Sequence, residues 1–310
     1  MIVSLAANAA PAAEQERMRM NTKEPGQAWR FASLTISDGE FDSFKNLIFE
    51  KSGIHLRESK RELLRTRLGA LIREKGLGSF KEYFEFILND RSGRELVAML
   101  DAVSTNVTSF FREDGHFEYL GKTVAPMVIK RYEKSSIKNI RGWSAGCSSG
   151  EEAYSIAITL LEVAGLGGRG WEMKVLATDI STEMLEKGQR GEYPEDKLKS
   201  APGRLRQKYF DKVEKESEKI YSVKPEVKKL ISFRRFNLMT ARYPFKRKFD
   251  FIFCRNVMIY FDRPTQQSLI GKFYDALEPG GALMIGHSES LTGIDHRFKY
   301  VRPTIYQKPE

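Results

Sequence analysis

A run of small residues followed by two carboxylates, between residues 145 and 152, has the composition of a ligand-binding turn. Ala145, Gly146 and the four residues after them are small, and Glu151 and Glu152 then open an apolar-rich helical pattern. A turn of this kind after a buried strand lets a ligand approach the main chain at the carboxyl edge of a parallel sheet. The acid pair would repel a phosphate, which is the usual ligand of a helix N-terminus.

The two carboxylates favour a ligand that is positively charged or rich in hydroxyl groups. No lysine follows the glycines as in nucleotide triphosphate loops, and the glycine spacing differs from the dinucleotide-binding pattern. S-adenosylmethionine, with its sulfonium, ammonium and ribose groups, has both properties. For each of Glu151 and Glu152, the alternative is that it only complements the positive end of the helix dipole.

Asp179, which follows a predicted strand at residues 174–178, is a further candidate ligand. A carboxylate at this position commonly accepts hydrogen bonds from the two hydroxyl groups of a nucleoside ribose. The competing role for Asp179 is the N-cap of a helix, because Ile180, Ser181 and Thr182 lead into a helical pattern. Its place at the end of a strand favours the ribose.

The elements that must position these residues alternate between strands and helices from residue 137 onward. Apolar runs predict strands at residues 137–144, 174–178, 231–236, 249–254 and 282–286, and helical spacing predicts helices near residues 151–161, 182–187 and 265–277. Such alternation predicts an α/β domain at residues 137–310, with a doubly wound, mainly parallel sheet covered on both faces. A last strand within residues 299–307 is expected to be antiparallel.

A separate, all-helical domain is predicted for residues 31–104. Four S-x-x-E capping boxes, which begin at Ser37, Ser59, Ser79 and Ser92, predict four short helices. Residues 1–30 begin with an apolar, alanine-rich stretch that contains Pro11 and lacks a basic segment before it. They are interpreted as a disordered tail and not as a signal peptide.

Two other segments interrupt the regular patterns. Residues 105–136 are expected to hold a linker and a first helix. The linker is too polar for the core near Asn106, Thr108 and Arg112. These three side chains either point into a cleft or satisfy backbone groups of the linker. Residues 188–230 are highly charged and too many for a structureless loop. We expect a small inserted sub-domain there, with edge strands around residues 220–223 and 227–230.

The formal net charge of +10 favours an acidic partner, which nucleic acid, an anionic membrane or an acidic protein surface could supply. One predicted helix is conspicuously basic and is either a docking face or a solvated surface. Nucleic acid is not favoured there, since the helix lacks the interleaved aromatic residues of single-strand binders. The basic residues are Lys60, Arg61, Arg65, Arg67 and Arg73.

Several classes of protein do not fit the composition. No apolar run approaches the roughly 18 residues of a membrane span, so no membrane insertion is expected. Cys147 and Cys254 are the only cysteines, which argues against a disulfide framework and fits a reducing cytosol. The four histidines are scattered without ligand spacing, so no metal site is predicted.

Five motifs, in this order along the chain, resemble the CheR family of bacterial chemotaxis receptor methyltransferases. They are residues 106–113, 143–152, 177–180, 236–238 and 253–261. The resemblance extends from about Phe41 to the C-terminus. It implies a helical N-terminal domain joined to a class I S-adenosylmethionine-dependent methyltransferase domain with a small antiparallel insertion.

The resemblance also implies roles for individual residues. By motif, the residues around S-adenosylmethionine, whose product is S-adenosylhomocysteine, are Asn106, Thr108, Arg112, Ala145, Glu152, Asp179, Asn237, Leu238, Arg255 and Asn256. Arg112 and Tyr260 would lie beside the transferred methyl group and act in catalysis. The implied substrate is a glutamate carboxylate on a cytoplasmic receptor bundle; this acid is already ionised near pH 7, so no general base is required.

The implied receptor is acidic, which favours the docking interpretation of the basic helix. Some family members also bind a receptor tail peptide by adding a strand to the inserted sub-domain. Those members have glycines in the sub-domain loop, whereas residues 211–219 have none, so tethering is not expected here. The alternatives are a class I methyltransferase that acts on a small carboxylic acid or RNA, and a non-catalytic module that senses S-adenosylmethionine.

Overall fold

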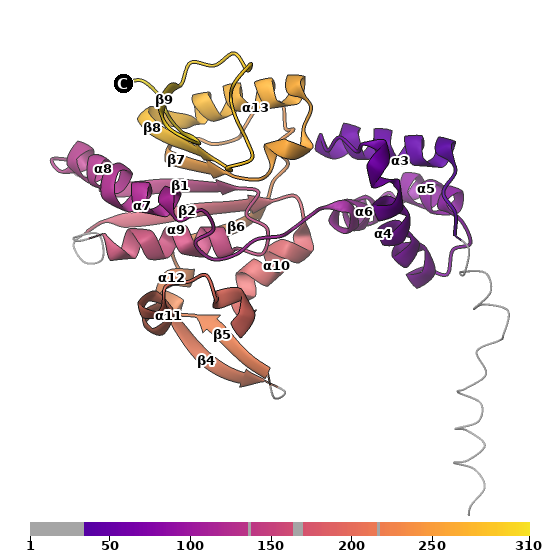
Figure 1. Cartoon of the computed structure of the whole chain (residues 1–310), viewed down its shortest axis with the longest axis horizontal. Helices are drawn as coiled ribbons and strands as arrows, with labels where there is room; N and C mark the ends of the chain where they lie inside the picture. Colours follow the sequence, from indigo (N-terminus) through magenta and orange to yellow (C-terminus); the bar gives the residue numbers. More distant parts are fainter. Residues whose placement is uncertain (1–33, 136–137, 164–169, 216–217) are drawn as a thin grey trace, which may run out of the picture.

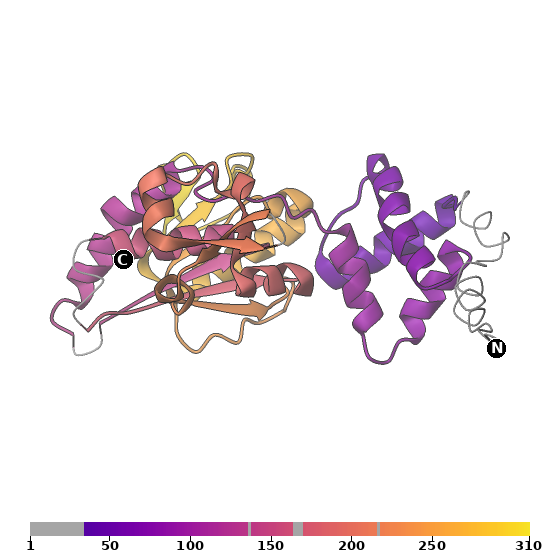
Figure 2. The same cartoon turned by 90° about the horizontal axis from the view of Figure 1, so that it is seen from below.

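The structure, a computed structural model, describes residues 34–135, 138–163, 170–215 and 218–310. The tail predicted for residues 1–30 lies outside the described residues. Figure 1 shows three parts: a group of N-terminal helices, a large sheet with helices packed on it, and a small β unit that projects from one side of the sheet. Figure 2 shows the N-terminal helices beside one end of the sheet.

Between residues 34 and 104 the structure describes four α-helices, the number that the capping boxes predict. They are α3 (Asp38–Ser52), α4 (Arg61–Glu74), α5 (Phe80–Asn89) and α6 (Arg94–Val103), with a short 3₁₀ helix, η1 (Glu58–Lys60), before α4. They share a core of their own around Phe41, Phe44, Leu68, Tyr83 and Met99.

Only two of the four predicted capping serines cap a helix. Ser37 and Ser79 accept hydrogen bonds at the starts of α3 and α5. Ser59 lies inside η1, which runs directly into α4, so no free helix end is left to cap. The N-cap of α6 is Gly93, because the carboxylate of Asp90 accepts from the N–H of Glu95, the group that Ser92 was expected to cap.

The central sheet has seven strands in the order β6-β2-β1-β7-β8-β10-β9. The first five are parallel neighbours, and β10 is antiparallel to β8 and β9, which confirms the predicted fold class. The last predicted strand is in fact two, since the chain turns at Thr304, where φ is +63°. The bounds are β1 Asn139–Ala145, β2 Glu172–Asp179, β6 Ile231–Arg235, β7 Phe249–Cys254, β8 Leu277–Ile285, β9 Lys299–Arg302 and β10 Ile305–Gln307.

The two faces of the sheet have separate cores. One contains Val175 and Phe253 and is covered by α7 (Gly115–Tyr119), η2 (Leu120–Val124), α8 (Ala125–Tyr132) and α9 (Glu151–Glu162). The other contains Trp143 and Phe249 and is covered by α13 (Arg263–Ala276). α10 (Thr182–Arg190) packs against β2 and β6. Of the described helices, none is long and apolar enough to cross a membrane.

The linker is more deeply buried than its polar composition predicts. Phe110 is fully buried and packs edge-on against Tyr193 and Phe210, at ring-centroid distances of 4.9 and 5.2 Å. Phe111 packs in the same way against Phe117. The prediction that this segment stays out of the core is therefore wrong for its two aromatic residues, which anchor the polar ones.

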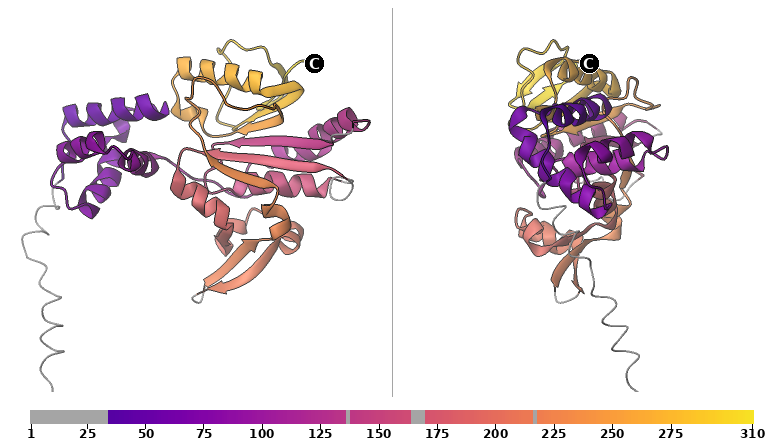
Figure 3. Two further views of the ribbon diagram at one scale, coloured as in Figure 1. Left: turned by 180° about the vertical axis from the view of Figure 1, so that it is seen from behind. Right: turned by 90° about the vertical axis from the view of Figure 1, so that its right-hand side faces the viewer.

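The insertion forms a three-stranded antiparallel sheet in the order β3-β5-β4. Figure 3 shows the β4/β5 hairpin extending away from the main sheet. Residues 227–230 are not an edge strand as predicted, because Pro225 starts the short helix α12. Residues 220–223, also predicted as an edge strand, lie in the central strand of this sheet, and the charged residues 211–215 lie in one of its two edge strands. The elements are β3 Glu192–Pro194, η3 Glu195–Leu198, α11 Gly203–Tyr209, β4 Phe210–Lys215, β5 Glu218–Val223 and α12 Pro225–Lys228.

Candidate functional site

A cavity lies at the carboxyl ends of the parallel strands, between the sheet and the N-terminal helices. The structure brings almost all the residues predicted for the site to this cavity. Those that line it are Asn106, Thr108, Arg112, Glu152, Asp179, Asn237, Leu238, Arg255, Asn256 and Tyr260. Ala145 is the exception: it is fully buried in the core beside Trp143, and Gly146 reaches the cavity in its place.

The small-residue turn brings the main chain up to the cavity. Gly146 has a φ of +84°, and its N–H donates to the carbonyl of Thr178, 2.8 Å away on the neighbouring strand. A Cβ atom at residue 146 would lie 2.4 Å from a methyl carbon of Val257. Glycine is therefore required here both by the backbone conformation and by the packing.

Asp179 binds the turn and does not cap α10. Its carboxylate accepts from the backbone N–H of Ser148 at 2.8 Å and of Ser181 at 3.0 Å. The N-cap of α10 is Ser181, whose hydroxyl accepts from the N–H of Met184, so the N-cap alternative for Asp179 is wrong. Burial raises the pKa of Asp179, although the N–H groups oppose this. A carboxylate held in this way can still accept bonds from two adjacent hydroxyl groups.

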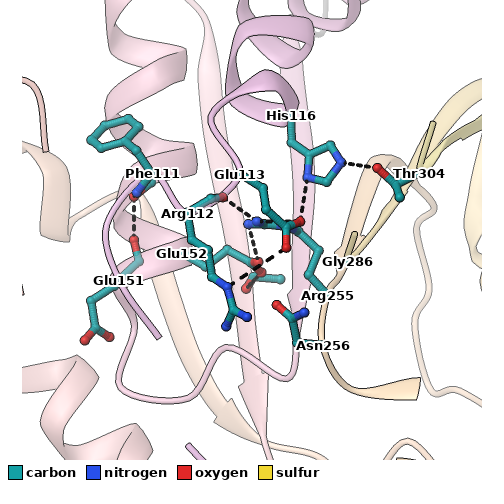
Figure 4. Close-up of polar contacts among 12 residues, drawn as sticks. Phe111, Arg112, Glu113, His116, Glu151, Glu152, Arg255, Asn256, Gly286 and Thr304 are labelled. Atoms are coloured by element: carbon teal, nitrogen blue, oxygen red, sulfur yellow. Dashed lines mark hydrogen bonds and ion pairs between the residues drawn. The ribbon is translucent and has the colours of Figure 1, made fainter. Parts of the chain in front are cut away.

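Figure 4 shows Arg255 between two carboxylates. Its Nη1 lies 3.1 Å from Oε2 of Glu152, and its Nη2 lies 3.0 Å from Oε2 of Glu113. Burial raises the pKa of Glu152, against the opposing effects of Arg255 and the Ser144 hydroxyl. Burial also tends to raise the pKa of Glu113. This effect is outweighed by the charge and hydrogen bond of Arg255 and by the hydrogen bond from the His287 N–H, so the pKa of Glu113 is lowered.

The two glutamates at the start of α9 have different environments. Glu152 lines the cavity, and its Oε1 accepts from the Ser144 hydroxyl at 2.6 Å. Glu151 is fully buried and is not among the residues that line the cavity; its Oε2 accepts from the Ser149 hydroxyl at 2.7 Å. Burial raises the pKa of Glu151. Glu152 thus fits the ligand interpretation, and Glu151 fits a role within the helix start.

The linker is fixed at several points, so that Arg112 projects into the cavity. The Asn106 carbonyl accepts from the Ser148 hydroxyl at 3.1 Å, and the Phe111 N–H donates to the Ser155 hydroxyl at 2.9 Å. Phe111 and Glu113, on either side of Arg112, have φ values of +52° and +57°. Such strained backbone is typical of functional sites. The Arg112 side chain is 38% exposed and also donates to the Val107 carbonyl, so both predicted roles of the linker occur together.

The N-terminal helices contribute part of the cavity wall, which sequence reasoning missed. The residues are Ser52, Ile54, His55, Leu56, Lys60, Leu63 and, at the end of α6, Val103. The His55 N–H donates to the Tyr260 carbonyl at 2.8 Å, and Asn237 donates from Nδ2 to the Lys51 carbonyl at 2.6 Å. The glycine at residue 53 was a signal of this contact in the sequence, because a Cβ atom there would lie 2.5 Å from the sulfur of Met239. It marks a close approach of the two parts as well as a helix end.

Two of the histidines that are scattered in the sequence meet beside Glu113. The Nδ1 of His116 lies 3.6 Å and the Nε2 of His287 3.9 Å from its Oε2 atom, a geometry that could hold a metal ion. The same oxygen already accepts from the Arg255 guanidinium, and that positive charge opposes a cation there. The absence of a metal site stays a prediction, but its basis, that the histidines are apart, is corrected by the structure.

The charges around the cavity are arranged so that acids lie deep and bases lie near solvent. Glu152 and Asp179 are 8% and 9% exposed, whereas Lys60 is exposed and Arg112 is half-exposed. Buried carboxylates favour a ligand with a positive centre, since a buried charge needs a partner. The exposed bases favour an acidic second substrate.

Some residues of the predicted basic face bind to groups within the N-terminal helices. Arg61 makes ion pairs with Asp38 and Glu58. Arg67 donates from Nη1 to the carbonyls of Ala102 and Ser104, at 3.1 and 2.6 Å, and so caps the end of α6. The structure therefore does not present all five basic residues as one free surface.

Two family models match this chain. Residues 39–104 match the CheR methyltransferase all-alpha domain, and residues 106–307 match the CheR methyltransferase SAM-binding domain, which confirms S-adenosylmethionine as the predicted cofactor.

Curated relatives agree with the family models. A chemotaxis protein methyltransferase of Borreliella burgdorferi is 38% identical over 89% of this chain and 96% of its own length. A probable chemotaxis protein methyltransferase of Rhizobium etli is 40% identical over 84% of this chain and 96% of its own length. The chemotaxis protein methyltransferase of Escherichia coli is 37% identical over 88% of this chain and 92% of its own length. The resemblance seen in the motifs is thereby confirmed: the chain belongs to the CheR methyltransferase family.

Proposed function

We propose that this protein transfers the methyl group of S-adenosylmethionine to glutamate side-chain carboxylates of chemotaxis receptors and so forms methyl esters. The observation that carries the proposal is one cavity that is lined both by the buried acids Glu152 and Asp179 and by the more exposed bases Lys60 and Arg112. Membership of a methyltransferase family whose named relatives act in chemotaxis supports the choice of donor and acceptor. In this proposal the bounds of the helical domain are residues 31–104, and those of the methyltransferase domain with its insertion are residues 137–310.

The deep end of the cavity holds the donor in this proposal. Asp179 binds the ribose hydroxyl groups, and Glu152, which is supported by Ser144 and Arg255, faces the positive end of the donor. The other cofactor contacts are those predicted by motif: Asn106, Thr108, Arg112, Asn237, Leu238, Arg255 and Asn256, all of which line the cavity. Ala145 was predicted to contact the cofactor, but it is enclosed in the core, and Gly146 makes this contact in the proposal.

The acceptor end of the cavity orients a carboxylate. When bound, S-adenosylmethionine supplies a methyl group on a sulfonium sulfur, which leaves as the neutral thioether of S-adenosylhomocysteine. An ionised glutamate needs no base, so the protein contributes alignment and exclusion of water. Arg112 attracts and orients the carboxylate, and the Tyr260 hydroxyl donates a hydrogen bond to it.

The receptor docks on the basic face near the cavity mouth. Lys60 lines the cavity, and α4 carries Arg61, Arg65, Arg67 and Arg73. Because the glutamates modified in such receptors lie on acidic helices, attraction between exposed charges brings the two proteins together. Cys147 and Cys254 are buried free thiols, which supports a reducing, cytoplasmic location.

The test is transfer of a tritiated methyl group to receptor-containing membranes, followed by release of methanol in base, which reports an ester. We expect labelling by the wild type and at least a ~10-fold loss of turnover in Arg112→Ala and Tyr260→Phe. Tyr300→Phe, at an exposed tyrosine outside the cavity lining, is the matched control. Wild-type turnover in both site variants would refute their roles. Label in a small acid or RNA without receptor, or cofactor binding without transfer, would favour the alternative functions.

A further inference from the structure

One buried side chain outside the cavity lining, Glu289, holds the loop after β7, which carries five of the residues that line the cavity. Glu289, 8% exposed, lies in the segment after β8. Its Oε1 accepts backbone N–H bonds from Val257, Met258 and Ile259 at 2.9, 2.7 and 3.3 Å. Its Oε2 accepts from Asn256 at 3.0 Å and from Gly286 at 2.6 Å. A single carboxylate thus binds four consecutive N–H groups of the loop after β7.

These N–H groups have a physical need for an acceptor. Met258 begins the short 3₁₀ helix η4 (Met258–Tyr260), and the first N–H groups of a helix have no partner inside it. Met258 is buried, and a buried N–H without a partner is destabilising, so the carboxylate favours the conformation of the loop in which these N–H groups are bound. Asn256 has a φ of +58°, in the left-handed region that Asn tolerates better than most residues with a side chain, and the bond from its N–H to Glu289 holds this turn.

The loop leads directly into the site. Arg255, Asn256 and Tyr260, which all line the cavity, lie within six residues of the chain. The residues beside the carboxylate are closely packed. A Cβ atom at Gly286 would lie 2.8 Å from the backbone nitrogen of Asn256 and 2.9 Å from Oε2 of Glu289. A change at Glu289 would therefore shift the backbone of residues that touch the bound molecules.

We infer that Glu289 is a positioning residue for methyl transfer, which sets the backbone of residues 256–259 and thereby places Asn256 against the donor and Tyr260 against the acceptor. The inference rests on the proposed function, since it assigns the loop to that site. Glu289 itself does not touch the substrates, because it is not among the residues that line the cavity. It acts through the main chain of its neighbours.

The first test is Glu289→Gln in the full chain, measured by melting temperature, calorimetric affinity for S-adenosylhomocysteine, and kcat and KM with receptor membranes. The amide keeps one acceptor oxygen but turns an NH₂ group toward backbone donors, so the loop must move. Since a misplacement of about 1 Å can cost ~100-fold in rate, we expect kcat to fall ~10- to 100-fold and affinity to fall several-fold. Glu289→Asp, which keeps the charge, should recover part of both.

Asp250→Asn is the matched control, because Asp250 is also a buried acid that accepts a backbone N–H, that of Arg141, but lies outside the cavity lining. It should lower the melting temperature without changing the kinetics of the folded enzyme. If the Glu289→Gln enzyme is folded and keeps wild-type kcat and affinity, the inference is wrong. If Glu289→Gln and Glu289→Asp are both unfolded, Glu289 serves general stability and the inference also fails. A wild type that neither binds nor transfers would refute the proposed function instead.

Discussion

The guanidinium of Arg255 lies 3.1 Å from Oε2 of Glu152, and the two side chains are only 2% and 11% exposed. The other edge of the same guanidinium contacts Glu113 at 3.0 Å. One cation thus separates the partly buried carboxylate of Glu113 from the buried carboxylate of Glu152, which lines the cavity. The arrangement holds a negative charge ready for a positively charged ligand, but it leaves that acid dependent on a single cationic partner.

Removing the cation in Arg255→Met should destabilise the protein by about 3–5 kcal/mol, because it leaves the buried carboxylate of Glu152 without its cationic partner. The measurement is urea denaturation, with Lys187→Met as control, since Lys187 pairs with Glu183 on an exposed helix surface. The control should lose less than about 1 kcal/mol. Equal losses in the two variants would mean that Arg255 is not needed to compensate the buried acid.

His116 should make stability fall in mild acid. Burial, with the charge of Arg255, lowers the pKa of His116 to about 3, so the folded state keeps it neutral while the unfolded state binds a proton near pH 6.5. This contribution is complete above pH 6.5 and is lost as the pH falls, by about 1.4 kcal/mol per pH unit down to about pH 3. Denaturation at pH 7.0 and 5.5 measures it. His116→Gln should lose this part of the slope; an unchanged slope would assign it to other groups.

Asp179 should make cofactor binding weaken in acid. Burial raises its pKa, so the folded protein without ligand begins to protonate this acid at a pH above that of a free aspartate. Only the ionised form accepts bonds from both ribose hydroxyl groups, so affinity is retained at higher pH and falls as the pH drops through the raised pKa. Calorimetry with S-adenosylhomocysteine between pH 7.5 and 4.5 measures the effect. Asp179→Asn should bind more weakly with a flatter pH profile, and an equally steep profile would locate the titrating group elsewhere.

The sequence was sufficient where local pattern and site chemistry coincide. The strand at residues 249–254 was predicted to the residue, because its run of buried residues ends at a clear change of composition. The small-residue turn, the acid pair Glu151 and Glu152, and Asp179 were identified from their place after strands, whereas the choice of Glu152 within the pair came from the family resemblance. The strand and the turn are each formed by a short stretch of chain, and the conformation of such a stretch is decided by residues that are neighbours in sequence.

The contacts that were missed join residues far apart in the chain. Glu113 and Arg255 are 142 residues apart, and no local pattern indicates that they pair. His55 and Tyr260 meet through backbone atoms, for which residue type gives no signal. The capping role of Ser92 was mispredicted for a related reason: Asp90, which the capping-box pattern ignores, competes for the same N–H.

Gly146→Ala should destabilise the protein by more than about 1 kcal/mol and reduce cofactor affinity, because the backbone has a φ of +84° and the new methyl group would overlap Val257. The matched control is Gly271→Ala in α13, where no atom lies within 4 Å of the place that the new methyl group would take. That change should stabilise the helix by about 0.5–1 kcal/mol. Thermal unfolding and calorimetry measure both variants. A Gly146→Ala protein that binds the cofactor normally would show that the turn has room to relax.

Arg73 and Arg67 lie on the same basic helix but should respond differently to substitution. Arg73 is exposed, whereas the Arg67 guanidinium caps the last turn of α6 through two carbonyl groups. Arg67→Ser should therefore cost about 1.5–3 kcal/mol of stability, the range for hydrogen bonds to a charged group. Arg73→Ser should leave stability within about 0.5 kcal/mol.

The receptor assay separates docking from folding at these two positions. If the exposed face attracts an acidic receptor, Arg73→Ser should raise the KM for receptor at low salt. The difference from wild type should shrink at physiological ionic strength, where charges are screened over about 8 Å. For Arg67→Ser, any change in KM should be insensitive to salt, because its cause is the loss of a helix cap. An Arg73→Ser enzyme with wild-type KM at low salt would identify this face of α4 as ordinary solvated surface, and docking would then depend on Lys60 and Arg112 at the cavity itself.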